Sequence, residues 1–287
     1  LQELAALSGL VPTVAVIMGP SAGHGALTAL LMDFVIMVRG AAIFSAGPPL
    51  VAAATAEFVT KEELGGVDVQ VKQSGVAHNI ADNDHEALAL VRQYLSYLPL
   101  NAWERPPRLS LKNNPRRKLT AILDLIPPDA RKPYDVRLLI EMVADEDSVF
   151  EIQPLYGESI ITAFARLGGQ SVAVVANQPL VKAGMVDSDA ADKAAHFLEV
   201  ADAFHLPIIF LTDNPGVMAG TAAERAGTLR SAARMYKAQS AVRSAKLNVT
   251  LRKAYGFGSS LMAMNPFDQQ TATLAFPAAT LGAMPAE

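Results

Sequence analysis

Short β-rich apolar runs alternate with helical patterns along this chain, and that alternation limits its possible folds more than any other feature. A short apolar run is typical of a strand that is buried on both faces. Strands separated by helices favour parallel pairing, so the sequence predicts an α/β fold. The predicted strands are residues 14–18, 34–38, 171–176 and 207–212, with another beginning at 248–251, and the predicted helices are residues 26–32, 83–98, 134–143, 189–205 and 222–245.

Capping residues mark the start of two of these helices. Asn83 stands where it can cap the helix over residues 83–98, and Glu86 follows three residues later as a capping-box partner. Asp187 or Ser188 can cap the helix over residues 189–205 in the same way.

Composition supports a folded core and argues against several classes of protein. Hydrophobic residues make up 51% of the chain and charged residues 18%, so disorder is not expected. The formal net charge of −4 argues against a grip on nucleic-acid phosphates as the main activity. The chain has no cysteine, which excludes disulfides, thiolate nucleophiles and Cys-ligated metal sites and suits a reducing, intracellular setting. Pro and Gly interrupt the uncharged stretch at residues 4–32, so no membrane span is expected there.

A basic, proline-containing segment separates two halves of the chain. Residues 99–118 contain four prolines and six Lys or Arg residues, with no acidic residue after Glu104. We interpret this segment as a solvated linker, the alternative being a site for an acidic partner or a nucleotide phosphate. The predicted domains are residues 1–104 and 119–287, joined by a linker at 105–118. The chain begins at Leu1 and ends in LGAMPAE, which leads us to expect that both domains are truncated.

Two distant segments share one plan. VAVIMGPSAGHGALTAL near residue 14 and VTLRKAYGFGSSLMAM near residue 249 each place a β-rich run, a group of small residues and a helix-like apolar stretch in the same order. A repeat of this kind indicates two related domains.

The Gly-rich turns of this repeat are the strongest candidates for chemistry. A strand that enters a helix through small residues leaves N–H groups without partners at the helix N-terminus, where they can bind an anion or a developing oxyanion. The alternative is tight packing of helix on strand. Neither turn fits the GxGxxG or P-loop pattern. The first turn offers Gly23, His24 and Gly25, and the second offers Gly256, Phe257, Gly258 and Ser259.

Side chains offer little further chemistry. The five histidines include no HExxH pair, so no zinc site and no other metal site is predicted. His196 and His205 are interpreted as structural, whereas His24 lies in the turn, where we expect its backbone N–H to act. Ser21 lacks the spacing of a nucleophile elbow.

One further strand end is a candidate binding site. Asp213 and Asn214 precede Pro215 and Gly216 after a predicted strand, where ligands often bind in α/β sheets. A simple turn is the alternative. With donors but no evident nucleophile, metal site or acid–base pair, the sequence favours a reaction whose reactive groups come from substrate or cofactor.

A series of ordered motifs then points to a family. Before the basic segment these are MGPSAGHGALTALLMDFVIMV, FSAGPPLV, VTKEELGG and SGVAHNIADND, and after it PYDVRLLIEMVADEDSVFEIQPLYGESIITAFARLGGQSVAVVANQP, SDAADKAAHFLEVADAFHLPIIFLTDNPGVMAGTAAERAG and LRKAYGFGSSLMA. The chain resembles the carboxyltransferase subunit of biotin-dependent acyl-CoA carboxylases, the propionyl-CoA carboxylase β-subunit group. The resemblance implies two crotonase-like ββα-superhelix domains and a hexamer, in which the N-domain of one protomer faces the C-domain of another.

The resemblance also implies roles for particular residues. The family's N-domain oxyanion pair falls on Gly23 and His24, and its C-domain pair falls on Phe257 and Gly258. The position linked to acyl-chain choice falls on Ser260. Gly25 and Gly216 are assigned to substrate binding beside these residues. Many relatives have two glycines at the first pair and Gly–Ala at the second, so His24 and Phe257 add bulk in this chain.

The implied activity is transfer of a carboxyl group from carboxybiotin to the α-carbon of an acyl-CoA. The expected partners are a biotin carboxylase and a biotin carboxyl carrier subunit, with neither nucleic acid nor membrane. The expected location is the cytoplasm, or the mitochondrial matrix in a eukaryote. Two alternatives stay open: a biotin-dependent decarboxylase of malonyl-type or glutaconyl-type CoA esters, and a non-catalytic subunit that scaffolds an assembly.

Overall fold

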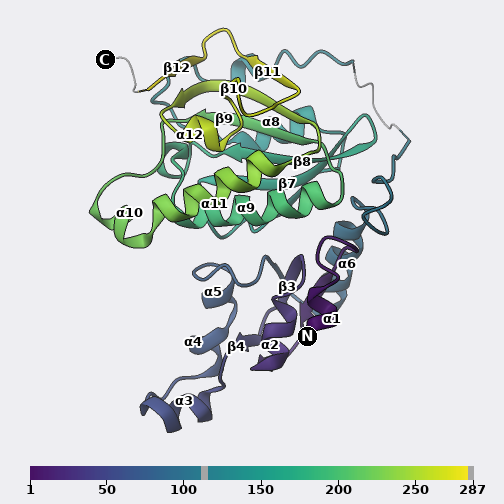
Figure 1. Cartoon of the computed structure of the whole chain (residues 1–287), viewed down its shortest axis with the longest axis vertical. Coiled ribbons are helices and arrows are strands. Elements are labelled where there is room, and N and C mark those ends of the chain that lie inside the picture. Colours follow the sequence, from purple (N-terminus) through teal and green to yellow (C-terminus); the bar gives the residue numbers. More distant parts are fainter. Residues whose placement is uncertain (111–115, 284–287) are drawn as a thin grey trace. The chain divides into compact units, whose positions relative to one another are not determined.

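The computed structural model describes residues 1–110 and 116–283 and divides the chain into two compact units (Figure 1). The N-unit comprises Leu1–Arg105 with Gln153–Tyr156, and the C-unit comprises Pro106–Ile152 with Gly157–Glu287. The predicted linker at 105–118 stays a prediction, because residues 111–115 lie outside the described residues.

The strands of the N-unit form two small parallel sheets. The three-stranded sheet has the order β1–β3–β5, and its central strand is buried at every position. The two-stranded sheet pairs β2 with β4. The bounds are β1 (Val14–Ile17), β2 (Pro20–Ala22), β3 (Phe34–Val38), β4 (Ala42–Phe44) and β5 (Asn79–Ala81).

Six helices complete the N-unit, and the cap of the longest differs in part from the prediction. Asn83 caps α6 by accepting from the N–H of Glu86. The Glu86 carboxylate accepts from the N–H of Asp82 rather than from that of Asn83, so the expected capping box is not formed. The bounds are α1 (Gln2–Ala5), α2 (His24–Ala29), α3 (Pro48–Thr55), α4 (Lys61–Gly65), α5 (Val67–Gln70) and α6 (Asp84–Leu95).

A mixed sheet organises the C-unit. Its order is β11–β10–β9–β8–β7–β6, and β12 also pairs with β10. The β6–β7 and β7–β8 pairs are antiparallel, and the pairs from β8 to β12 are parallel. The bounds are β6 (Phe150–Ile152), β7 (Ile160–Leu167), β8 (Gln170–Asn177), β9 (Ile208–Asn214), β10 (Lys246–Tyr255), β11 (Ala272–Ala275) and β12 (Thr280–Gly282).

Helices cover both faces of this sheet. Figure 1 shows α9 and α11 side by side along one face, and these two helices pack against each other. Because strand side chains alternate between faces, Phe164 of β7 packs against Phe197 of α9, with the two rings tilted by 36°, whereas Ala163 joins the opposite core with Ile140 of α8. The helices are α7 (Ile122–Leu125), α8 (Val136–Val143), α9 (Ser188–Ala203), α10 (Thr221–Ala226), α11 (Thr228–Ala241) and α12 (Gly258–Leu261), with a 3-10 turn at Lys182–Gly184.

The predicted helix at residues 222–245 is wrong in its continuity and its end. Gly227 adopts φ 78° and separates α10 from α11. A glycine in the left-handed region commonly terminates a helix, because it carries no Cβ to oppose that conformation. The helix α11 ends at Ala241, and beyond it the N–H groups of Arg243 (2.8 Å) and Ser244 (2.9 Å) donate to the Asp202 carboxylate before β10 begins.

The basic segment supplies a helix cap where it is described. Arg117 donates from its guanidinium to the carbonyls of Met142 (3.0 Å) and Ala144 (2.6 Å), at the C-terminal end of α8. A cation at this end complements the helix dipole and satisfies carbonyls that lack helical partners. At least this member of the basic segment therefore stabilises the C-unit.

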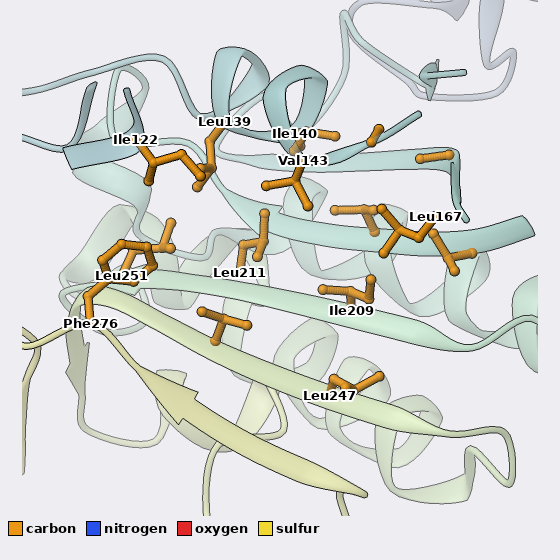
Figure 2. Close-up of a pocket in the computed structure, with 15 residues that line it drawn as sticks. Ile122, Leu139, Ile140, Val143, Leu167, Ile209, Leu211, Leu247, Leu251 and Phe276 are labelled. Atoms are coloured by element: carbon orange, nitrogen blue, oxygen red, sulfur yellow. The ribbon is translucent and has the colours of Figure 1, made fainter. Parts of the chain in front are cut away.

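An apolar cavity of about 230 Å³ lies between α8 and the sheet. Figure 2 shows Leu139, Ile140 and Val143 on one side of it and Ile209 and Leu247 on the sheet side. All of its lining residues are apolar. The cavity is part of the hydrophobic layer on the α8 face, because most of its lining belongs to the core cluster there.

Candidate functional site

The first Gly-rich turn joins β2 to α2 in the N-unit. Gly23 adopts φ 56° and caps α2, a backbone conformation that favours glycine. Its N–H donates to the carbonyls of Phe44 (3.3 Å) and Ser45 (3.1 Å) at the end of β4. Within the described chain, the N–H groups of His24 and Gly25 have no hydrogen-bond acceptor.

The second Gly-rich turn joins β10 to α12 in the C-unit. Gly256 adopts φ 57°, and its N–H donates to the carbonyl of Gly282 (3.0 Å) at the end of β12. Phe257 caps α12. The N–H groups of Phe257 and Gly258 find no acceptor among residues 1–110 and 116–283.

The two turns share their strand pairing and their glycine of positive φ, although α2 begins directly after Gly23 and α12 begins two residues after Gly256. In each, a strand pairs in parallel with a second strand just before the turn: Pro20 lies opposite Ala42 in the N-unit, and Lys253 lies opposite Thr280 in the C-unit. In each, a glycine of positive φ then donates its N–H to the end of that second strand. Gly23 therefore corresponds to Gly256, His24 to Phe257, and Gly25 to Gly258.

This equivalence bears on the predicted donor pairs. Phe257 and Gly258 both have an N–H without an acceptor, whereas Gly23 uses its N–H within the turn. The N-unit pair that corresponds to Phe257 and Gly258 is His24 and Gly25, one residue further along than the pair implied by the family resemblance.

Gly216 and Ser260 lie beside the second turn. Asn214 of β9 accepts from the N–H of Gly216 (2.6 Å) and donates to the carbonyl of Gly258 (3.2 Å), which brings all three residues together. Gly216 adopts φ 130°. A Cβ on Gly258 would lie 2.9 Å from the Asn214 side chain. Ser260 is half-buried two residues beyond Gly258, and its hydroxyl oxygen accepts from the side-chain amide of Asn265 (2.5 Å).

A largely apolar hollow of about 290 Å³ adjoins this turn. Phe257, Ser260 and Leu261 form one side, and α11 forms the other. The exposed fraction of Phe257 is 54%, so its ring forms an open edge of the hollow. The helix contributes Leu229, Ala232, Ala233 and Tyr236.

Buried charges near this turn are paired with each other. Arg252 donates from Nε to a carboxylate oxygen of the fully buried Asp213 (2.7 Å), and Lys253 Nζ lies 3.6 Å from the other oxygen. Burial lowers the pKa of Lys253, and the Asp213 charge partly opposes that effect. Arg252 also donates to the carbonyls of Asp129 (2.9 Å) and Lys132 (2.8 Å). Asp213 is thus engaged in a structural ion pair.

The remaining predicted side chains are placed as follows. His24 is exposed, and the Thr28 hydroxyl donates to its carbonyl (2.7 Å). His78 is buried, accepts from the N–H of Val35 (2.9 Å) and stacks on Phe34. Among the described residues, no group of three or more His, Asp or Glu side chains could hold a metal ion. None of the described helices is long and apolar enough to cross a membrane.

Sequence reasoning missed two residues that contact α12. Gln239 of α11 donates to the carbonyl of Ser260 (2.9 Å), and Asn248 of β10 donates to the carbonyl of Met262 (2.7 Å). Asn248 carried a signal, since it begins a predicted strand and an amide that is buried in a sheet must find a partner. Gln239 carried none, because polar residues are common on helices.

The chain was compared with known proteins. The sequence profile described as the carboxyl transferase domain matches residues 1–287. The methylmalonyl-CoA carboxyltransferase 12S subunit of Propionibacterium freudenreichii subsp. shermanii is 40% identical over 281 residues, 98% of this chain and 53% of that protein. The methylmalonyl-CoA decarboxylase subunit alpha of Veillonella parvula is 40% identical over 250 residues, 87% and 49% of the two chains.

A solved structure has the same fold. A transcarboxylase 12S crystal structure, described as a hexamer assembly with hydrolysed methylmalonyl-coenzyme A bound, superimposes with a TM-score of 0.94 at 37% identity. The match covers 98% of this chain and 54% of that chain. The predicted α/β fold is confirmed. The chain spans about half the length of the curated relatives it matches.

Proposed function

We propose, because this chain belongs to the carboxyl transferase domain family, that it takes part in transferring a carboxyl group from carboxybiotin to the α-carbon of an acyl-CoA. One observation carries the proposal: two similar turns each combine a glycine of positive φ with adjacent N–H groups that have no acceptor within the described chain, those of residues 24–26 in the first turn and residues 257 and 258 in the second. Paired backbone donors suit the carbonyl oxygens of a thioester and of the biotin ureido group, both of which gain negative charge during such a transfer.

The family resemblance suggests which turn binds which oxygen, and the hydrogen bonds of Gly23 support moving the N-unit pair by one residue from the implied Gly23 and His24. We assign the thioester oxygen to the N-unit turn, through the N–H groups of His24 and Gly25, with Gly23 holding the turn in shape. The ureido oxygen is assigned to the N–H groups of Phe257 and Gly258. When bound, carboxybiotin would supply CO2 and then a base for the α-proton, which fits the absence of an evident side-chain base at either turn in the described part of the chain.

Acyl-chain choice is assigned to the hollow beside the second turn. Ser260 contributes to its wall, and the remaining lining is mainly apolar, which suits a hydrocarbon chain. Gly216 is assigned to substrate binding because it lies against Gly258 through the shared Asn214 contact.

The finer architecture belongs to the same proposal. Two crotonase-like domains, at residues 1–104 and 119–287 with a linker at 105–118, would place one donor turn in each. The proposed partners are a biotin carboxylase and a biotin carboxyl carrier subunit in a homo-oligomer, as the hexamer described for the transcarboxylase 12S structure supports. The proposed location is the cytoplasm, or the mitochondrial matrix in a eukaryote.

The direct test is a coupled carboxylation assay on the protein as its gene encodes it. The protein is mixed with biotin carboxylase, biotinylated carrier, ATP and labelled bicarbonate, and acetyl-, propionyl- and longer acyl-CoAs are offered separately. We expect label in the acyl-CoA that depends on the carrier. No carrier-dependent label with any acyl-CoA would overturn the proposed carboxylation.

A decarboxylase is the second candidate, favoured by the similarity to the Veillonella subunit. It would use the same turns and run the transfer in the opposite direction. Transfer of the carboxyl group from methylmalonyl-CoA or malonyl-CoA to the biotin of an uncarboxylated carrier, without ATP, would support it. Physiological direction then depends on whether an ATP-dependent biotin carboxylase accompanies the protein.

A further inference from the structure

The short helix α12 is held by three buried side-chain amides. Asn214 donates to the carbonyl of Gly258 (3.2 Å), Gln239 to that of Ser260 (2.9 Å), and Asn248 to that of Met262 (2.7 Å). The three come from separate elements, β9, α11 and β10, and each is fully buried. We infer that Asn214, Gln239 and Asn248 are positioning residues, which fix the direction of the Phe257 and Gly258 N–H groups during carboxyl transfer.

The orientation of two of these amides is fixed by a second partner. The Asn214 oxygen accepts from the N–H of Gly216 (2.6 Å), and the Gln239 oxygen accepts from the ammonium of Lys246 (3.1 Å). A backbone N–H and an ammonium can only donate, so the amide nitrogen must face the carbonyl of α12. The Asn248 oxygen is engaged by the hydroxyl of Thr250 (3.1 Å).

The helix needs outside support because it is so short. A four-residue helix leaves carbonyls without intrahelical partners, and it cannot stabilise itself in water. The amides of Asn214, Gln239 and Asn248 donate to these carbonyls from three elements and so hold α12 in place. The N–H groups of Phe257 and Gly258 belong to the same rigid segment, so their direction is set by these amides.

Contact at Gly258 strengthens the case for Asn214. A Cβ on Gly258 would meet the Asn214 side chain at 2.9 Å and the backbone carbon of Gly216 at 3.0 Å. The first residue of α12 therefore rests directly on the amide that holds it. A small movement of Asn214 would be passed to the neighbouring donors, and a misplacement of about 1 Å can reduce a rate by about 10²-fold.

The inference rests on the proposed function, and its test separates the two. Asn214→Asp, Gln239→Glu and Asn248→Asp each keep the size and the acceptor oxygen but replace the NH2 donor. The matched control is Asn177→Asp on β8. Asn177 is equally buried, donates to the carbonyl of Gly184 (3.1 Å) and accepts from the N–H of Asp213 (3.2 Å), so it tests a buried amide that contacts β9 without bonding a carbonyl of α12. Each variant of the intact protein is assayed with biotin carboxylase and biotinylated carrier. Thermal melting of a separate sample gives the folded fraction, and kcat is expressed per folded protein.

We expect the three variants to lose about 10²-fold in kcat with KM nearly unchanged, because the donors act on charge that develops in the transition state. The control should stay within about threefold of the original kcat, since Asn177 does not hold the donors. Equal losses in control and variants, or no loss in the variants, would overturn the inference. If Asn214→Asp does not fold, Asn248→Asp decides, because the hydroxyls of Thr212 (2.7 Å) and Thr250 (3.1 Å), which contact the Asn248 amide, can both donate to the new carboxylate.

Amide hydrogen exchange provides a readout that needs no turnover. The segment at residues 257–261 should exchange faster in the three variants and at the original rate in the control. An intact protein that labels no acyl-CoA but shows this exchange pattern would contradict the proposed function and leave the structural half of the inference standing. Unchanged exchange in all three variants would contradict the positioning role itself.

Discussion

The two Gly-rich turns share one backbone plan but are supported differently. Both contain a glycine with φ near 57° whose N–H is bonded to the end of a neighbouring strand. The second turn enters a helix whose first residue is buried and whose carbonyls accept from three side-chain amides. The first turn is exposed at Gly23, His24 and Gly25, and the only side-chain donor to α2 within the described chain is the hydroxyl of Thr28.

This contrast separates what local sequence dictates from what the surrounding fold adds. A small-residue turn after a parallel strand suffices to place two donors, because glycine permits the left-handed conformation. Holding those donors rigidly requires buried groups from other elements, which the C-unit supplies through β9, β10 and α11. We therefore expect the second turn to be the stiffer one within the structure described.

The largest effect is expected from replacing a donor residue with proline. His24 is the first residue of α2, and Phe257 is the cap of α12 with φ −74°, so proline fits the backbone of both. His24→Pro and Phe257→Pro each remove an N–H and should reduce kcat by at least about 10²-fold. Steady-state carboxylation with matched melting curves measures this.

Alanine at the same positions is the control for the side chain. His24→Ala and Phe257→Ala keep the N–H, so most activity should remain. Loss of turnover in a normally folded His24→Ala protein would mean that the imidazole itself acts, and the backbone account of that turn would be wrong.

A second contrast is expected at the second donor residue of each turn. Gly258→Ala places a Cβ 2.9 Å from Asn214 and should lower the free energy of unfolding by about 1–3 kcal/mol. Gly25→Ala places a Cβ 3.3 Å from the movable hydroxyl of Ser21 and should change stability little. Denaturant unfolding of both variants tests whether the second turn is the more tightly packed. Equal stability losses would contradict that difference.

Equal effects are expected where the two turns are alike. Among the described residues, a Cβ on Gly23 or Gly256 meets only a carbonyl oxygen, at 3.9 Å and 3.6 Å, so the main penalty of alanine is the positive φ. Gly23→Ala and Gly256→Ala should each destabilise by about 1–2 kcal/mol. Chemical denaturation measures both, and a large difference between them would show that the turns are not equivalent.

The smallest effect on the best substrate is expected from enlarging Ser260. Ser260→Met would fill part of the 290 Å³ hollow and should shift activity toward shorter acyl-CoAs with modest overall loss. Parallel assays with acetyl-, propionyl- and longer acyl-CoAs measure the ratio. An unchanged preference among these acyl-CoAs would contradict the assignment of acyl-chain choice to this hollow.

Periodicity predicted much of the fold, and long-range pairing explains most of what it missed. The runs at residues 34–38 and 171–176 correspond to β3 and β8, because buried strands leave a continuous apolar signature. The run at residues 14–18 corresponds to β1, but the expected burial on both faces is wrong there, since only Ile17 of β1 is buried. The hairpin partner β7 was not predicted, since its run at Ile160–Leu167 is broken by polar Thr162 and Arg166. The break at Gly227 was missed because an isolated glycine does not by itself end a helical pattern.

The site was predictable only in part. The glycine pattern located both turns. It could not show that the N–H of Gly23 donates to the carbonyls of Phe44 and Ser45, because those residues lie at the end of another strand. The three amides under α12 likewise meet only in the folded chain. Their separation along the sequence leaves no local spacing to detect.

The most direct measurement is a structure of the intact protein with an acyl-CoA and biotin bound. The account predicts that the thioester oxygen lies 2.7–3.1 Å from the backbone nitrogens of His24 and Gly25, and the ureido oxygen equally close to those of Phe257 and Gly258. Substrate oxygens held instead by side chains, or lying outside hydrogen-bond distance of these four nitrogens, would contradict it.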